Sequence, residues 1–334
     1  MTVSAWLRGL LVLLLLIGAV STQRIVAAQV PPADRDYWPT AGWRTAAPES
    51  QGMDPALLAE ADARIRAELP YVTSLLVARG GDLVFEQYYG GFAGPEATVQ
   101  IWSATKSFTA TAVGIAIDEG LLRLDQTVGE LISDRIPEGA DPRAAAVTVE
   151  QLLTMTSGFA WDSSTDYQFA FDEVDLVARA LGLPMACDPG TCYEYNSGNP
   201  QVLSAMIQAV TGQTMAAYLQ PRLFDPLGIP QPVWATSITG ETLGAVGLEV
   251  TPRDMAKLGF LYLNDGVWDG AQIVSSSWVE AATSVQSSGA NAAGVSLGQA
   301  PYGYLWWVPE IVGLPAFFGL GLGIQIIYVV PGLD

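Results

Sequence analysis

The stretch Trp102-Ser-Ala-Thr-Lys-Ser-Phe-Thr-Ala110 (WSATKSFTA) places a serine three residues before a lysine in an otherwise apolar and hydroxyl-rich run. Lysine is rare in the 334 residues: Lys106 and Lys257 stand against 13 arginines. The run from Ser103 to Glu119 predicts a helix. Because residues i and i+3 share one helix face, the Lys106 amine can point at the hydroxyl of Ser103.

A buried lysine at this position could accept the proton of the serine. The ordinary lysine pKa of about 10.4 has to fall to about 7–8 for a useful base, and burial alone can supply that change. Apolar neighbours make burial credible: Trp102, Phe108, Val113 and Ile115. The free N–H groups at the helix start could also stabilise an oxyanion. The alternative is an N-cap serine beside a solvated lysine.

The composition excludes several classes of protein. There is no histidine, which rules out a Ser-His-Asp triad and any histidine-ligated zinc. Half of the residues are apolar and 15% are charged, so the chain can form a substantial core. The net charge of −19 repels nucleic acid and anionic membranes. We therefore expect no nucleic-acid partner, and no membrane contact beyond an export signal.

The N-terminus is typical of an export signal. Arg8 precedes the apolar run Gly9–Val20, and Val26-Ala27-Ala28 offers a cleavage point. The sequence predicts a signal peptide over 1–28, an extended leader over 29–50 and one catalytic domain over 51–334. The protein would then be periplasmic or extracellular. The alternative is an uncleaved N-terminal membrane anchor, because Arg24 lies close to the cleavage point.

The two cysteines, Cys187 and Cys192, flank an Asp-Pro-Gly turn. A turn of this kind can bring their Cβ atoms to bridging distance, and export exposes them to oxidising conditions. We therefore expect a disulfide, with two free thiols as the alternative. Two cysteines without histidine make a poor ligand set, so no metal site is predicted.

The order of elements predicts an α+β fold. A helix from Asp54 to about Leu69 is followed by a hairpin, Val72–Arg79 with Leu83–Tyr89. The middle, about 95–295, is mostly helical, and late strands follow at Pro301–Val308 and Gln325–Val330. We expect the first and last segments to form one antiparallel sheet flanked by helices, with the helical region beside it and a site between the two.

Three segments, taken in order, carry a family resemblance: Ser103-x-x-Lys106, Leu152–Gly158 (LLTMTSG) and Pro189–Gly198 (PGTCYEYNSG). Together they resemble the serine β-lactamase-like superfamily, whose Ser-x-x-Lys signature occurs in penicillin-binding proteins and β-lactamases. The closest resemblance is to the class C β-lactamase-like branch, which includes esterases and 6-aminohexanoate-oligomer hydrolases. It runs from about Gly52 to the end and implies a β-lactamase/DD-peptidase-like fold.

The resemblance implies roles for five residues of the site. Ser103 is similar to the nucleophile that forms an acyl-enzyme, and Lys106 to its proton partner. Tyr195 is similar to the tyrosine of the Tyr-x-Asn motif, a general acid or base, with Tyr193 as the competing candidate. Ser197 stands where that motif has asparagine, and Asn196 lies beside it. Either side chain could hydrogen-bond the substrate.

The third family motif departs from the family pattern. The family places Lys or His, one residue and then Gly on a strand that lines the site, whereas Phe318–Gln325 (FGLGLGIQ) has no basic side chain. Gly321 and Gly323 would let the strand approach the substrate, and the N–H near Leu322 could be the second oxyanion donor. The alternative is that the glycines serve close packing alone.

These observations predict a secreted serine hydrolase that needs no cofactor. Without the cation, binding of a substrate carboxylate should be weak, which favours a neutral small-molecule ester, amide or peptide-like substrate. The alternatives are penicillin-binding or β-lactamase-type activity, or a catalytically impaired ligand-binding domain on the same fold. Family members continue beyond Asp334 with a further strand and a helix, so we expect both to be missing from this chain.

Overall fold

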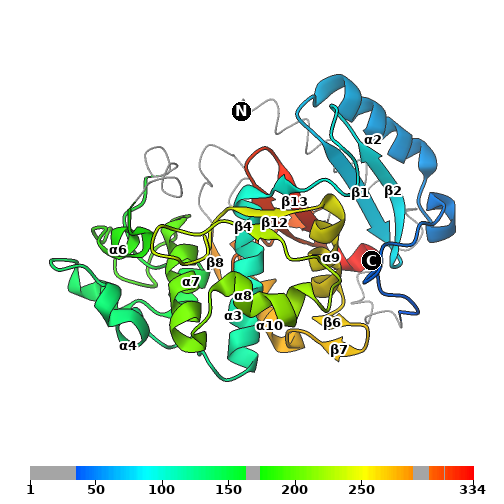
Figure 1. Cartoon of the computed structure of the whole chain (residues 1–334). Helices are drawn as coiled ribbons and strands as arrows, with labels where there is room; N and C mark the ends of the chain where they lie inside the picture. Colours follow the sequence, from blue (N-terminus) through cyan, green and yellow to red (C-terminus); the bar gives the residue numbers. More distant parts are fainter. Residues whose placement is uncertain (1–34, 163–173, 289–300, 312) are drawn as a thin grey trace.

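The computed structural model describes residues 35–162, 174–288, 301–311 and 313–334 (Figure 1). The signal peptide expected over 1–28 lies outside these residues. The described part of the leader, 35–50, joins a neighbouring strand only at Thr45, through an isolated bridge to Leu83, and then enters the short helix η2, Pro48–Gln51.

The N-terminal unit is a helix packed on a hairpin. Helix α2, Pro55–Glu68, starts at Asp54, whose carboxylate accepts a hydrogen bond from the Ala56 N–H at 2.8 Å. Strands β1, Ser74–Arg79, and β2, Asp82–Tyr88, pair antiparallel. The turn between them, Gly80-Gly81, has positive φ at both residues, which suits a tight hairpin. Figure 1 shows α2 lying along this hairpin.

A mostly helical region surrounds helix α3, Thr105–Asp118. Every residue of this helix from Thr105 to Ala116 is buried. Helix α7, Gly198–Thr211, packs against α3 and carries ten buried residues. The remaining α-helices are α4 Val128–Ile132, α5 Val149–Leu153, α6 Leu176–Leu181, α8 Met215–Leu219, α9 Pro252–Leu263 and α10 Ser276–Ala282. The short helices are η3 Trp102–Ala104, η4 Ser133–Arg135, η5 Pro142–Ala146, the single π-turn η7 Gln220–Phe224 and η8 Pro331–Leu333.

Short strands connect these helices. A three-stranded sheet has the order β3-β5-β4, from Val99–Gln100, Leu248–Val250 and Val233–Trp234. The two-residue strands pair as β6 Val267–Trp268 with β7 Ala271–Gln272, β8 Ser287–Ser288 with β9 Pro301–Tyr302, and β10 Glu310–Ile311 with β11 Leu314–Pro315. The strand expected over Pro301–Val308 is therefore wrong beyond Tyr302. The chain turns at Gly303, where a Cβ would overlap the carbonyl oxygen of Ala282.

The last hairpin joins β12, Phe317–Gly321, to β13, Gln325–Val329. It does not join β1 in one sheet, which corrects our expectation for the first and last segments: β1–β2 and β12–β13 are separate two-stranded sheets. Both pack on α9, whose Gly259 lets Ile327 and Val329 approach closely. The α+β class is confirmed, in the form of several small antiparallel sheets among helices.

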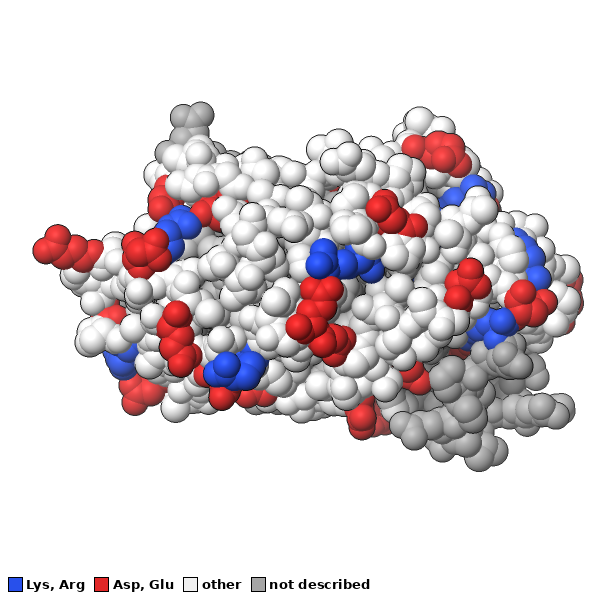
Figure 2. Space-filling model, turned by 60° about the horizontal axis from the view of Figure 1, so that its bottom comes forward, with Lys and Arg blue, Asp and Glu red and all other residues white. Residues whose placement is uncertain are grey.

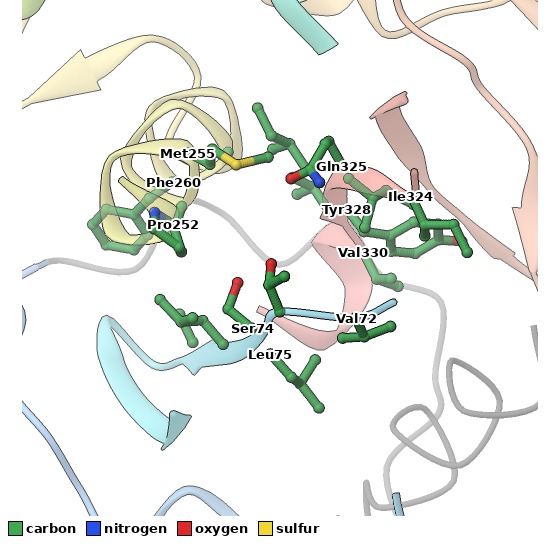
Figure 3. A pocket seen from close by; sticks show the side chains of 18 of the residues that line it. Val72, Ser74, Leu75, Pro252, Met255, Phe260, Ile324, Gln325, Tyr328 and Val330 are labelled. Carbon is green, nitrogen blue, oxygen red and sulfur yellow. The ribbon is translucent and has the colours of Figure 1, made fainter. Parts of the chain in front are cut away.

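A groove separates β1 from β13 (Figure 3). Its lining comes from β1, α9 and β13 and from residues next to them, and includes Ser74, Leu75, Met255, Phe260, Gln325 and Tyr328. Its volume of about 210 Å³ lies below the roughly 300–1,000 Å³ typical of small-molecule pockets. The groove is therefore smaller than a typical substrate site.

Charged side chains are scattered over the surface. On the face in Figure 2 the basic side chains form small separate groups, each beside acidic ones. Ion pairs such as Arg253–Glu86 at 2.7 Å and Arg222–Glu119 at 2.8 Å likewise place a basic side chain beside an acidic one. Within the part of the chain that the structure describes, none of the helices combines the length and apolar character needed to cross a membrane.

Candidate active site

Ser103 lies at a strained turn. It occupies η3, directly before α3, and the preceding residue Trp102 has φ = 50°, a left-handed conformation that is unfavourable for a bulky side chain. Such strain concentrates at functional sites because the surrounding structure has to hold it. Here it fixes the serine at the start of a buried helix.

Lys106 faces Ser103, as the spacing predicts. Its Nζ lies 2.9 Å from the Ser103 Oγ and donates to the Ala245 carbonyl at 3.2 Å. The side chain is 1% exposed, and burial lowers the pKa of Lys106 to about 7. The amine can therefore be neutral near physiological pH. The alternative interpretation, in which Lys106 is solvated, is therefore wrong, because the side chain is buried.

Tyr195 is the tyrosine that the structure brings to this pair. Lys106 Nζ lies 5.1 Å from the centroid of its ring, and the same amine contacts Ser103. Burial raises the pKa of Tyr195 to about 12, and the nearby Ser103 hydroxyl acts in the opposite direction. The competing Tyr193 has a buried hydroxyl without a partner among the described residues, and burial raises its pKa further still. The geometry favours Tyr195.

Two attachments fix the segment that carries Tyr195. On both sides of the tyrosine, backbone N–H groups contact Met155: Glu194 N–H donates to its carbonyl at 2.9 Å, and Asn196 N–H to its Sδ at 3.4 Å. Cys187 and Cys192 form a disulfide just before it. The Leu152–Gly158 segment, through Met155, therefore supports the tyrosine.

Ser197 and Asn196 differ in their surroundings. The Asn196 side chain is buried, and its Oδ1 accepts a hydrogen bond from the Gly198 N–H at 2.7 Å, at the start of α7. Ser197 is partly exposed, and its hydroxyl makes no capping bond to α7. The partly exposed hydroxyl of Ser197 is therefore available to a substrate, whereas the buried amide of Asn196 is not.

Strand β12 packs directly behind the nucleophile. A Cβ at Gly321 would overlap the Ile101 carbonyl oxygen and lie 3.1 Å from the Cβ of Trp102, so glycine allows this approach. Leu322 and Gly323 are in the turn between β12 and β13, not in a continuous strand as expected; Leu322 is exposed and Gly323 has φ = 77°. Close packing thus explains Gly321.

Sequence reasoning missed two parts of the site. One is the Ala245 carbonyl, which orients Lys106 from 139 positions away and has no sequence signal. The other is an aromatic wall beside Tyr195: Trp307 stacks on it with ring centroids 5.6 Å apart, and Tyr302 meets it edge-on at 6.2 Å. The Trp306-Trp307 pair was the available signal for this wall.

Known proteins resemble this chain in sequence and in fold. The chain is 30% identical over 270 residues to a 6-aminohexanoate-dimer hydrolase of Paenarthrobacter ureafaciens, covering 74% of this chain and 66% of that protein. It is 30% identical over 185 residues to a lovastatin esterase of Penicillium rubens, covering 49% and 46%. Among solved structures, an octameric penicillin-binding protein homologue from Pyrococcus abyssi shares the fold, with a TM-score of 0.67, 22% identity and coverage of 84% and 72%.

The matches to curated relatives are partial in length: the chain spans between about half and two thirds of the proteins just named. The model of the family described as Beta-lactamase matches residues 66–333, which include Ser103, Lys106, Tyr195 and the β12–β13 hairpin. The chain belongs to the beta-lactamase family.

Proposed function

We propose that this protein is an exported serine hydrolase that cleaves a neutral ester or amide through an acyl intermediate on Ser103. The observation that carries the proposal is the contact between Ser103 and a buried lysine: Lys106 Nζ lies 2.9 Å from the hydroxyl and has its pKa lowered to about 7. Such an amine can take up the serine proton without first losing one of its own.

In the acylation step, the Ser103 oxygen attacks the substrate carbonyl while its proton passes to the neutral Lys106 amine. The negative charge that develops on the carbonyl oxygen would be stabilised by the N–H groups of Ser103 and Leu322. The tetrahedral intermediate then collapses, the bond to the leaving group breaks, and Lys106 passes the serine proton to the leaving oxygen or nitrogen, directly or through the Tyr195 hydroxyl. Tyr195 is suited to this because its pKa of about 12 keeps it protonated.

In the deacylation step, a water molecule attacks the acyl carbon. The neutral Lys106 amine takes its proton, directly or through the Tyr195 hydroxyl, and the bond between the acyl carbon and the Ser103 oxygen breaks. The proton then returns to the serine, which restores the starting state. Both steps use the same proton carriers, so no histidine is needed.

Neutral substrates are favoured by the β12–β13 hairpin. No basic side chain is present between Gly319 and Gln325 to bind a carboxylate, and the net charge of −19 disfavours anions further. The names of the relatives, a 6-aminohexanoate-dimer hydrolase and a lovastatin esterase, are consistent with an amide or an ester as the substrate class. Export is supported by the signal peptide that the sequence predicts over 1–28 and by the Cys187–Cys192 disulfide.

Intact-mass spectrometry of the full chain after treatment with a fluorophosphonate, and separately with a penicillin, tests the proposal. We expect one phosphonate adduct on the wild type and none on Ser103→Ala. The Ser103→Ala variant should also lose about a thousandfold or more in kcat/KM on p-nitrophenyl acetate.

Ser107→Ala is the matched control. Ser107 lies in the same helix, but its hydroxyl is buried and donates to the Leu305 carbonyl at 3.2 Å, so its removal should leave the adduct in place. A penicillin adduct that needs Ser103 would point instead to a penicillin-recognising enzyme. A folded wild type without any phosphonate adduct would refute the proposal.

A further inference from the structure

The adjacent tryptophans Trp306 and Trp307 are both buried in the main core cluster, but their ring partners differ. The Trp306 ring has its centroid 4.8 Å from that of Tyr262 and 5.4 Å from that of Phe317. Trp307 stacks on Tyr195 at 5.6 Å and 22°. One of two neighbouring, equally large side chains therefore belongs to the candidate site, and the other does not.

Trp307 is held in place from its other side. Its backbone N–H donates to the Phe318 carbonyl at 3.0 Å, and the Phe318 N–H donates back to the Trp307 carbonyl at 2.8 Å. The two side chains stack at 6.2 Å and 17°, and Phe318 stacks in turn on Tyr328 at 5.5 Å and 16°. Four rings thus form one continuous stack from Tyr195 to β13.

The Tyr195 ring depends on such contacts for its orientation. The Ser103 hydroxyl, which lies close enough to lower the pKa of Tyr195, has to move and react, so it cannot fix the ring through the catalytic cycle. Tyr302 meets it edge-on at 6.2 Å and also meets Trp307 at 4.8 Å and 81°. Stacked and edge-on aromatic pairs add directional stabilisation beyond burial of area.

We propose that Trp307 is a positioning residue, which acts by stacking on Tyr195 and holding its ring beside Lys106, whose amine contacts Ser103. This inference rests on the proposed function, because it assigns a partner to the proton-carrying tyrosine. A misplaced proton carrier slows the chemical step more than it weakens substrate binding, so kcat should fall while KM changes little.

The test compares three single variants on p-nitrophenyl acetate and by the rate of fluorophosphonate labelling. Trp307→Leu should lower kcat about ten- to hundredfold, and Trp307→Phe, which keeps a stacking ring, should stay within about threefold of the wild type. Trp306→Leu is the matched control: it removes an equal ring from the core and should lower Tm without the selective loss of kcat. Equal losses in Trp307→Phe and Trp307→Leu would overturn the proposal.

A double-mutant cycle with Tyr195→Phe separates positioning from general loss of structure. If Trp307 acts through the tyrosine hydroxyl, Trp307→Leu should cost less than about twofold further in the Tyr195→Phe background. Undiminished loss in that background would refute the inference. Failure of the proposed function looks different, because a folded wild type would then take no phosphonate adduct. With the adduct present, either a Tyr195→Phe as active as the wild type or an unimpaired Trp307→Leu refutes the positioning role alone.

Discussion

Lys106 loses nearly all of its hydration in the folded chain, and its pKa follows from that loss. The side chain is 1% exposed, and no cause other than burial is needed to bring its pKa from 10.5 to about 7. The other lysine, Lys257, is nearly as buried but lies 3.2 Å from the Asp254 carboxylate and donates to the Gly228 carbonyl. Among the residues that the structure describes, Lys106 has no carboxylate partner beside the candidate nucleophile, while Lys257 is paired.

The pKa of Lys106 predicts the pH dependence of acylation. The neutral amine is the active form, so below pH 7 the rate of fluorophosphonate labelling should fall about tenfold per pH unit as Lys106 becomes protonated. Above about pH 8 the rate should level off, because Lys106 is then almost entirely neutral. Tyr195, with a pKa of about 12, is still protonated there and adds no further change.

The measurement is the second-order labelling rate constant from pH 5 to pH 10. Lys257→Arg is its control, since this substitution keeps the charge that pairs with Asp254 and should leave the profile unchanged. A midpoint near pH 10 would mean that Lys106 keeps its ordinary pKa, and the assignment of Lys106 as the base would then be wrong.

At the scale of elements, β12 and the turn before α3 form one packed unit. Gly321 has no room for a side chain because the Ile101 carbonyl occupies the space of a Cβ. Gly319, two residues earlier on the same strand, lies against the Ser107 hydroxyl in the same way. The strand therefore sets the position of the turn that carries Ser103.

Gly321→Ala should move β12 away from this turn. We expect a loss of about 1–3 kcal/mol in the free energy of unfolding, from overpacking, and at least a tenfold loss of kcat/KM on p-nitrophenyl acetate. Urea denaturation and steady-state kinetics measure the two effects. Gly332→Ala is the control, since a Cβ there meets only the Leu314 Cδ2 at an ordinary 3.5 Å. Full activity and stability of Gly321→Ala would contradict the tight packing.

At the scale of the whole molecule, the groove between β1 and β13 divides the hydrophobic core. The main cluster includes Phe108, Phe260 and Ile327, whereas the α2–β1–β2 unit has two small clusters of its own, centred on Ile65 and Leu58. Few buried apolar contacts cross the groove, so the N-terminal unit should open at a lower free energy than the core around α3.

Amide hydrogen exchange can test this division residue by residue. The Tyr89 N–H donates to the Thr73 carbonyl, and residues of antiparallel strands alternate in direction, so the amides of Ser74 and Leu76 face the groove. The pairing of Phe318 with Trp307 places those of Ile326 and Tyr328 there as well, by the same alternation.

We expect the groove-facing amides to exchange at least about tenfold faster than their neighbours Leu75 and Ile327, which face a paired strand. A dilution series serves as the control for self-association. Equal protection of both sets at all concentrations would show that the strand edges are covered, and the division of the core at the groove would be wrong.

The sequence by itself determined the local features of this protein. Helix α2 starts at its Asp54 cap and ends close to Leu69, and Ser103 faces Lys106, because caps and i, i+3 spacing act within one element. The ordered motifs also indicated the family, which the match over residues 66–333 establishes.

Only the tertiary structure decided how distant segments meet. The Ala245 carbonyl on Lys106, the stacking of Trp307 rather than Trp306 on Tyr195, and the separation of β1 from β13 all depend on contacts between residues far apart in the chain. The pKa of Lys106 belongs here too, since the sequence made burial credible but only packing around α3 removes the water. Local patterns contain no information on which strand edges find a partner, because that depends on the shape of the assembled core.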